Sequence, residues 1–294
     1  MELRVLQYFL AVTREQSISG AAQTLHLSQP TLSRQLKEME EELGKKLMIR
    51  GNRRITLTEE GMILRKRAEE IMELVKKAED EISLSDEIIA GDISIGSGET
   101  DGVRFLARTV QELQKNYPLI HLHIISGDKV SVIEELDRGL IDFGLIFGEV
   151  DTSKYEYIKI PYKDTWGVIM RRDSALAQKE TITAEDLMDK PLILSRQSFQ
   201  YTDFYNFFPC GQEKLNIVAT YNLLFNGSLM VDEGMGYAIS FDKLINVSGN
   251  SNLCFRPLEP KLEADMSIIW KKYQIFTKTS EKFLEKLQEI LHLQ

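Results

Sequence analysis

Residues Ser17 to Leu57 read SISGAAQTLHLSQPTLSRQLKEMEEELGKKLMIRGNRRITL, and this stretch decides the fold of the N-terminal part of the 294-residue chain. Four of its apolar residues follow a four-three-four spacing, which places them on one face of a helix. They are Leu32, Leu36, Met39 and Leu43. Ser28 is a suitable N-cap, and Pro30 lies in the first turn, where its missing N–H is no loss. The pattern therefore predicts a helix from about Ser28 to Leu43 whose apolar face packs inward.

The opposite face of this predicted helix carries short hydrogen-bonding or cationic side chains. They are Gln29, Thr31, Ser33, Arg34 and Lys37. Such side chains near the N-terminal end of a helix are typical of a recognition helix, which contacts base edges in the DNA major groove. Two shorter helices are predicted before it, from Leu3 to about Glu15 and from Ile18 to Leu25, and the three helices would share one core.

A basic hairpin is predicted after Gly44, where the recognition helix ends. Two short apolar segments, 47–50 and 55–57, flank the sequence Gly51-Asn52-Arg53-Arg54. This arrangement is typical of a β-hairpin with two arginines at its tip. Narrow minor grooves attract inserted arginine side chains, so Arg53 and Arg54 are predicted to contact DNA beside the recognition helix. The region is therefore predicted to be a winged helix-turn-helix that binds a double-stranded DNA operator.

These residues resemble the LysR-type transcriptional regulators. The shared pattern is matched by Ala21-Ala22, Ser28-Gln29-Pro30, Ser33-Arg34-Gln35, Glu41-Glu42-Leu43-Gly44 and Leu57-Thr58-Glu59-Glu60-Gly61. The resemblance implies that Gln29, Pro30, Ser33 and Arg34 contact DNA together with the wing residue Arg53. The chain departs from the family over residues 48–52, where a Phe and another Arg are usual.

Composition and charge fit a modular DNA-binding protein. Its 294 residues are enough for two or three domains, and 43% hydrophobic with 28% charged residues is typical of a globular protein. Its net charge is −9, yet residues 1–58 carry nine Lys and Arg against six Glu, which leaves −12 for the remainder. A basic head with an acidic body is expected when only one end of the chain meets phosphate.

The sequence also sets expectations for location and cofactors. It has no apolar run of signal-peptide or transmembrane length, so we expect a cytoplasmic protein without membrane contact. Only Cys210 and Cys254 occur, without CxxC spacing, which predicts free thiols and no structural zinc. The four histidines are scattered and no P-loop or G-x-S-x-G motif is present, so neither an enzyme, a metal site nor a bound cofactor is predicted.

A long helix is predicted from Glu59 to about Ala90. Apolar or small residues recur there at intervals of four and three, as in a heptad seam: Leu64, Ala68, Ile71, Val75, Ala78, Ile82, Ser85 and Ile89. The seam predicts a homodimer joined through this helix, and the resemblance implies the same linker dimer. The alternative is a helix lying on the core of its own chain, because the small residues make the seam thin. A dimer and a tetramer both remain open.

The pattern changes at Gly91 to strands alternating with helices, which is typical of an open α/β fold. The resemblance implies a two-lobed effector domain like the periplasmic solute-binding proteins. We therefore divide the chain into a winged helix-turn-helix (1–58), a linker helix (59–90) and an effector domain (91–294). Lobe 1 of the effector domain is predicted to comprise 91–161 and 266–294, and lobe 2 to comprise 162–265.

Ligands of open α/β sheets bind outside the carboxyl ends of strands, where helix N-termini offer free N–H groups. Three predicted loops supply such residues: Ser97, Glu99 and Thr100; Gly127, Asp128 and Lys129; and Arg196, Gln197 and Ser198. The resemblance implies that Thr100 holds an acidic group of a small effector, whereas Glu99 replaces a frequent Ser. Glu99 is predicted either to pair with Lys129 or Arg196 in the empty cleft, or to select an effector with an amine. An anionic or zwitterionic metabolite is the predicted effector.

The residues thus predict a transcriptional regulator whose operator binding is modulated by a small molecule held between two lobes. RNA polymerase is a further candidate partner, and activation and repression are equally open. Two alternatives remain. One is a redox-responsive regulator that uses Cys210 and Cys254, and the other is a constitutive DNA-bridging protein whose α/β part only oligomerises.

Overall fold

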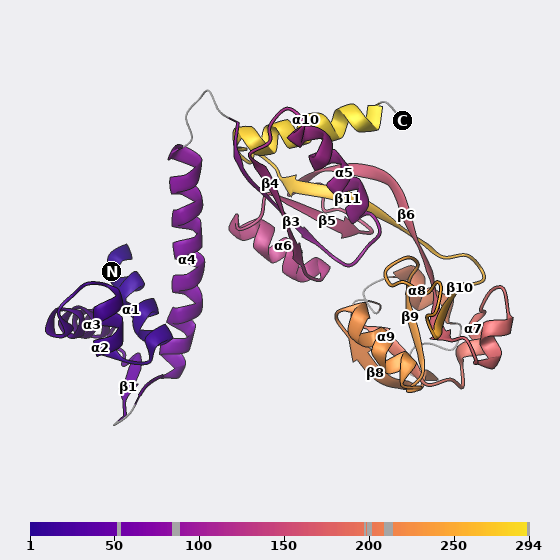
Figure 1. Ribbon diagram of the computed structural model, residues 1–294, viewed down its shortest axis with the longest axis horizontal. Helices are drawn as coiled ribbons and strands as arrows, with labels where there is room; N and C mark the ends of the chain where they lie inside the picture. Colours follow the sequence, from indigo (N-terminus) through magenta and orange to yellow (C-terminus); the bar gives the residue numbers. More distant parts are fainter. Residues whose placement is uncertain (52–53, 84–88, 197, 199–201, 209–213, 293–294) are drawn as a thin grey trace. The chain divides into compact units, whose positions relative to one another are not determined.

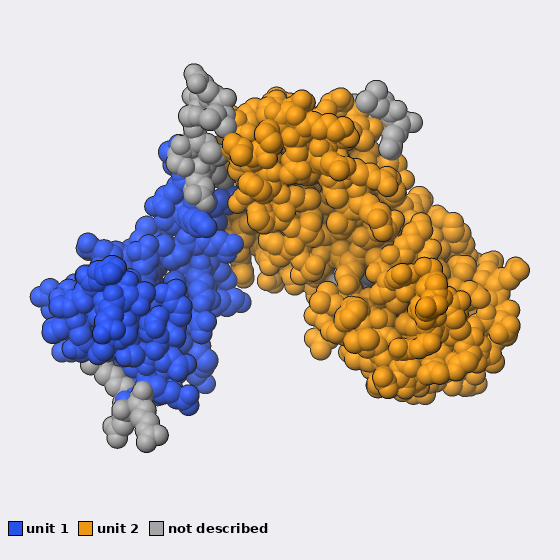
Figure 2. Space-filling model, viewed as in Figure 1, with its two compact units in different colours: residues 1–85 blue, residues 86–294 orange. Residues whose placement is uncertain are grey.

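The computed structural model describes residues 1–51, 54–83, 89–196, 198, 202–208 and 214–292. The chain divides into two compact units, Met1–Ser85 and Asp86–Gln294 (Figure 2). Within the described residues, no helix combines the length and the apolar character that crossing a membrane requires.

The first unit begins with three helices, α1 (Leu3–Glu15), α2 (Ile18–Thr24) and α3 (Gln29–Leu43). The three predicted helices are therefore present. Their shared core contains Phe9, Ala21, Ala22, Leu32, Leu36 and Met39. Leu43, which the spacing places on the inward face of α3, is 41% exposed, and Leu3, an apolar residue that the first helix was expected to offer to the shared core, is 47% exposed. Both lie at helix ends, where the periodic pattern extends beyond the surface that the neighbouring helices cover.

A short antiparallel hairpin follows, formed by β1 (Met48–Arg50) and β2 (Ile55–Leu57). The predicted wing is thus present, and the amide of Gly51 donates to the carbonyl of Arg54 at 3.1 Å to close it. The hairpin leads into α4 (Glu59–Ser83), the long helix of this unit (Figure 1).

The helix α4 differs from the predicted 59–90 helix at its end and on its apolar face. Ile89 lies outside α4 and packs on the core of the second unit, whereas Ser85 lies outside the described residues. Ala68 is fully buried and α4 packs against α1, so this part of the predicted seam lies on the core of its own unit. Further along α4, Leu74 is 38% exposed and Ile82 is 85% exposed.

The second unit has two lobes, and the first is an α/β lobe. Its strands are β3 (Gly91–Ser97), β4 (Ile120–Ser126), β5 (Phe143–Phe147) and β11 (Glu263–Lys271), and its helices are α5 (Val103–Gln114), α6 (Lys129–Arg138) and α10 (Lys278–His292). Strand β3 pairs in parallel with β4 and β5, whereas β11 runs antiparallel to β5. The C-terminal helix α10 packs on α5 and β3 and so belongs to this lobe (Figure 1).

The second lobe is built on the far half of β6 (Tyr155–Arg171), a 17-residue strand that continues from the first lobe. Its other elements are η1 (Ala175–Gln178), α7 (Ala184–Leu187), β7 (Leu192–Ser195), α8 (Thr202–Phe207), β8 (Ile217–Tyr221), α9 (Leu224–Asp232), β9 (Tyr237–Phe241) and β10 (Leu253–Pro257). The near half of β6 pairs with β11, and the far half pairs with β9 and β10. The predicted boundary at residue 162 therefore falls inside a continuous strand.

Candidate functional sites

The exposed face of α3 is the first candidate site. The hydroxyl of Ser28 accepts a hydrogen bond from the amide of Thr31 at 3.3 Å and so caps the helix. Leu32 and Leu36 are fully buried on the opposite side and fix the rotation of the helix. The predicted DNA-contacting residues then fall on one surface: Gln29, Pro30, Thr31, Arg34 and Lys37 are exposed, and Ser33 is half-buried.

The two cationic side chains of this surface, Arg34 and Lys37, form only exposed ion pairs. Arg34 lies 3.8 Å from Glu38, and Lys37 lies 3.4 Å from Glu41, each one turn along the helix and each exposed. Exposed ion pairs of this kind contribute little stability, so exchanging a carboxylate for a phosphate costs little. Arg54 of the wing is exposed as well, whereas Arg53 lies outside the described residues.

Glu40, which the sequence analysis did not single out, and Gly61, which it quoted only as part of the family pattern, hold the wing on the helices. The buried carboxylate of Glu40 accepts from the amides of Leu47 and Met48 at 2.7 and 3.2 Å, which fixes the start of the hairpin. At Gly61, a Cβ would lie 2.0 Å from the carbonyl oxygen of Leu47, so only glycine permits this approach. The sequence gives no sign of this role for Glu40, because a glutamate among other charged residues of a helix is expected to be exposed to solvent.

A cavity of about 330 Å³ between the two lobes is the second candidate site. Its lining joins four predicted effector residues, Glu99, Gly127, Asp128 and Arg196, with five others that were not predicted: Ser126, Ser131, Glu135, Asn222 and Leu223. Lobe 1 supplies the loops after β3 and β4, and lobe 2 supplies the loops after β7 and β8. All four loops follow the carboxyl ends of strands, where ligands of such sheets bind.

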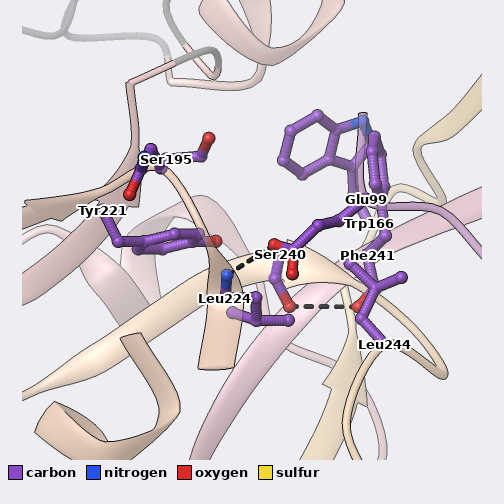
Figure 3. Close-up of a pocket in the computed structure, with 9 residues that line it drawn as sticks. Glu99, Trp166, Ser195, Tyr221, Leu224, Ser240, Phe241 and Leu244 are labelled. Atoms are coloured by element: carbon purple, nitrogen blue, oxygen red, sulfur yellow. Dashed lines mark hydrogen bonds between the residues drawn. The ribbon is translucent and has the colours of Figure 1, made fainter. Parts of the chain in front are cut away.

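A smaller recess of about 40 Å³ adjoins this cavity through Glu99 and Asn222, which line both. Three aromatic side chains line it, from Trp166, Tyr221 and Phe241. Figure 3 shows the Glu99 carboxylate among these rings, directed at the backbone of Leu224. The sequence analysis placed no aromatic residue here, because β6, β8 and β9 supply them from positions far apart in the chain.

Glu99 connects the two lobes directly. Its Oε2 accepts a hydrogen bond from the amide of Leu224, the first residue of α9, at 2.5 Å. The structure therefore differs from the predicted pairing with Lys129 or Arg196: among the described residues, Glu99 forms no ion pair with either. Lys129 instead donates to the carbonyls of Phe147 and Glu149 at 3.3 and 2.7 Å.

Three further predicted effector residues, Ser97, Thr100 and Ser198, are not among the residues that line the cavity. The Ser97 hydroxyl donates to Gly98, and the buried Thr100 hydroxyl accepts from the amide of Gly102 at 2.9 Å and lies against Met266. Ser198 is buried with no hydrogen-bond partner for its hydroxyl among the described residues, and Gln197 lies outside them. Their roles toward an effector remain predictions.

The pKa values of three ionisable residues around the cavity are shifted, by burial or by hydrogen bonds. Burial raises the pKa of Glu99, and the Leu224 amide only partly offsets this. Asp128 is the N-cap of α6, and its carboxylate accepts a hydrogen bond from the amide of Ser131 at 2.8 Å. This hydrogen bond lowers the pKa of Asp128. Burial also lowers the pKa of Lys129. Asp128 is thus the more firmly ionised of the two carboxylates.

Two family models match this chain. The one described as "Bacterial regulatory helix-turn-helix protein, lysR family" matches residues 3–62, and the one described as "LysR substrate binding domain" matches residues 87–291. The chain belongs to the LysR family. Like others of this family, it is a DNA-binding transcriptional regulator with an effector-binding domain, and it is not an enzyme.

Curated relatives and solved structures agree with this LysR-family assignment. The chain is 30% identical over 281 residues to the HTH-type transcriptional regulator AlsR of Bacillus subtilis (strain 168), covering 92% of this chain and 91% of AlsR. It is 26% identical over 295 residues to the uncharacterized HTH-type transcriptional regulator YvbU of the same bacterium, covering 99% of each. The crystal structure of full-length CbnR in complex with target DNA has the same fold, with 21% identity, a TM-score of 0.78 and coverage of 98% of this chain and 99% of CbnR.

The cysteines of this LysR-family chain bear on the redox alternative. Cys254 is a buried free thiol in β10 and packs in the main core of the second unit. A buried thiol in apolar surroundings is poorly reactive, because only the thiolate attacks an oxidant. Cys210 lies outside the described residues, so the predicted thiol switch gains no support from the described part of the chain.

Proposed function

We propose that this regulator binds its operator as a homodimer joined through α4, and that a small molecule held between the two lobes changes the arrangement of the DNA-binding units. The observation that carries the proposal is the cavity itself, which loops from both lobes line together. A ligand there contacts both lobes at once, so it binds different arrangements of the lobes with different affinity.

The exposed apolar residues of α4 support the homodimer. Met62, Ile63, Leu74 and Ile82 are exposed on this helix. Large exposed apolar side chains along one helix are typical of an interface that a second copy covers. Two DNA-binding units in one particle then contact two half-sites, as dimeric helix-turn-helix proteins do. We further propose a cytoplasmic location, no resident cofactor, and RNA polymerase as an additional partner.

The test uses the full-length chain. Operator fragments are first selected from fragmented genomic DNA by repeated binding, and footprints are then recorded with and without each member of a metabolite library. We expect at least one small molecule to change the footprint, and Arg196→Ala to weaken that response without weakening binding in its absence. If no small molecule changes either the footprint or the affinity, the constitutive DNA-bridging alternative is favoured.

A further inference from the structure

The recess beside Glu99 combines one carboxylate with aromatic surfaces. Trp166, Tyr221 and Phe241 surround it, and its volume of about 40 Å³ leaves room for a single small group rather than a whole ligand. A cation near an aromatic face is attracted by the electrons of the ring, and a carboxylate attracts it further. A substituted ammonium group matches both features of this recess.

The wider cavity is acidic. Three carboxylates line it, from Glu99, Asp128 and Glu135, whereas Arg196 is the one cation in that lining among the described residues. The Asp128 carboxylate stays ionised, since it accepts from the backbone and side chain of Ser131 at 2.8 Å. A dianionic ligand would enter a cavity with more negative than positive groups, and repulsion from the carboxylates of the lining would oppose its binding.

Among the described residues, no Lys or Arg forms an ion pair with Glu99, so its negative charge has no compensating cation there. The Leu224 amide is its hydrogen-bond donor, and the neighbouring Tyr221 hydroxyl donates instead to the carbonyl of Ile239 at 2.8 Å. A half-buried carboxylate without a counter-ion costs free energy, which an ammonium group on a ligand would recover.

We propose that the ligand of this cavity carries an ammonium group that occupies the recess beside Glu99, with an acidic or polar group facing Arg196. The effector is thus an amine-bearing, zwitterionic small molecule rather than a simple dicarboxylate. The inference rests on the proposed function, namely that this cavity is the effector site. Of the two roles that the sequence left open for Glu99, it favours the selection of an effector with an amine over pairing with Lys129 or Arg196.

The test compares matched straight-chain probes on the full-length protein. Dicarboxylates, ω-amino acids and diamines with four, five and six carbons differ only in their end groups, and calorimetry at pH 7.5 gives their affinities. We expect binding by an ω-amino acid and a weaker or absent signal for the dicarboxylate of the same length. Glu99→Gln should weaken the amine-bearing probe by more than about tenfold, because a charge-assisted hydrogen bond is lost.

A matched control separates the recess from general charge effects. Glu134→Gln removes the same charge from the exposed side of α6, outside the cavity lining, and should leave the affinity within about twofold. Tighter binding of a dicarboxylate that depends on Arg196 would overturn the amine inference while preserving the cavity as the effector site. Failure of every amine probe to bind would also overturn it, and binding that responds to none of the cavity variants would contradict the proposed function itself.

Discussion

Asp164 lies on β6 and pairs with Ala264 of β11, one residue before the strand passes from lobe 1 to lobe 2. The next residues, Thr165 and Trp166, pair with Glu263 of β11 and Phe241 of β9 respectively. The carboxyl is buried, and its Oδ2 has no hydrogen-bond partner among the described residues. Burial raises the pKa of Asp164 to about 6, and the Thr100 hydroxyl and Lys243 offset this only in part, while Asp101 and Asp242 add to it.

The raised pKa of Asp164 predicts a pH-dependent cost. A carboxyl whose pKa is raised by folding destabilises the fold progressively as pH increases from its ordinary value to about 6, and the cost stays constant above that. Asp164→Asn should therefore increase the free energy of unfolding of the second unit by about 2 to 3 kcal/mol at pH 8, with a smaller gain toward pH 4. Denaturant unfolding across this range measures it. The exposed Asp189→Asn serves as a control and should show no such trend.

At the scale of the element, α3 exposes the side chains that we predict to distinguish DNA sequences. Arg34→Ala should reduce the preference for operator over random DNA by roughly 1 to 3 kcal/mol, because an arginine that reads a guanine edge contributes to specificity. Fluorescence anisotropy at fixed salt with both DNAs gives the ratio. Arg104→Ala on α5 removes the same charge from the other unit and should leave the ratio unchanged. An unaltered ratio for Arg34→Ala would restrict this residue to phosphate contact.

The helix α4 carries the prediction about assembly. Ile71 and Val75, where the sequence pattern placed the seam, are half-buried in the described structure, so polar substitutions there would also disturb folding. Ile82, which is 85% exposed, gives a cleaner test. Ile82→Asn should weaken dimerisation by more than about tenfold in sedimentation at micromolar concentration, since an apolar contact is lost. Lys76→Asn, on the polar side of α4, should sediment as the parent does.

Elements with local signals could be predicted from the sequence, and those that depend on distant partners could not. Ser28, Pro30 and Gly44 mark the ends of α3, and the helix begins and ends there. In contrast, the lobe boundary predicted at residue 162 falls inside β6, next to Pro161, which lacks the N–H that a central strand uses. The structure accommodates it through a register shift in β11 between Asp265 and Ser267. The sequence could place Glu99 in a loop after a strand, but not against Leu224, which lies 125 residues further along.

At the scale of the whole molecule, the hydrogen bond between Glu99 and Leu224 joins the two lobes. Two effects act on it in opposite directions. The carboxylate gains a hydrogen bond at the start of α9, yet burial of its charge costs more, since the pKa of Glu99 is raised. Protonation therefore favours the arrangement in which the lobes meet at Glu99, and this stabilisation is lost as pH rises through the raised pKa. A cationic ligand group would remove the same cost at neutral pH.

Glu99→Gln should consequently favour this arrangement in the absence of ligand, because the glutamine amide oxygen still accepts from Leu224 but carries no charge. We expect the amides of α9 to exchange hydrogen roughly two- to fivefold more slowly at pH 7.5, a modest change because solvent screens a half-exposed carboxylate. The variant should also give the ligand-bound footprint on operator DNA without ligand. Glu134→Gln should match the parent in both measurements. Faster exchange in Glu99→Gln would mean that the charged hydrogen bond holds the lobes together, so that an ammonium ligand would separate them rather than join them.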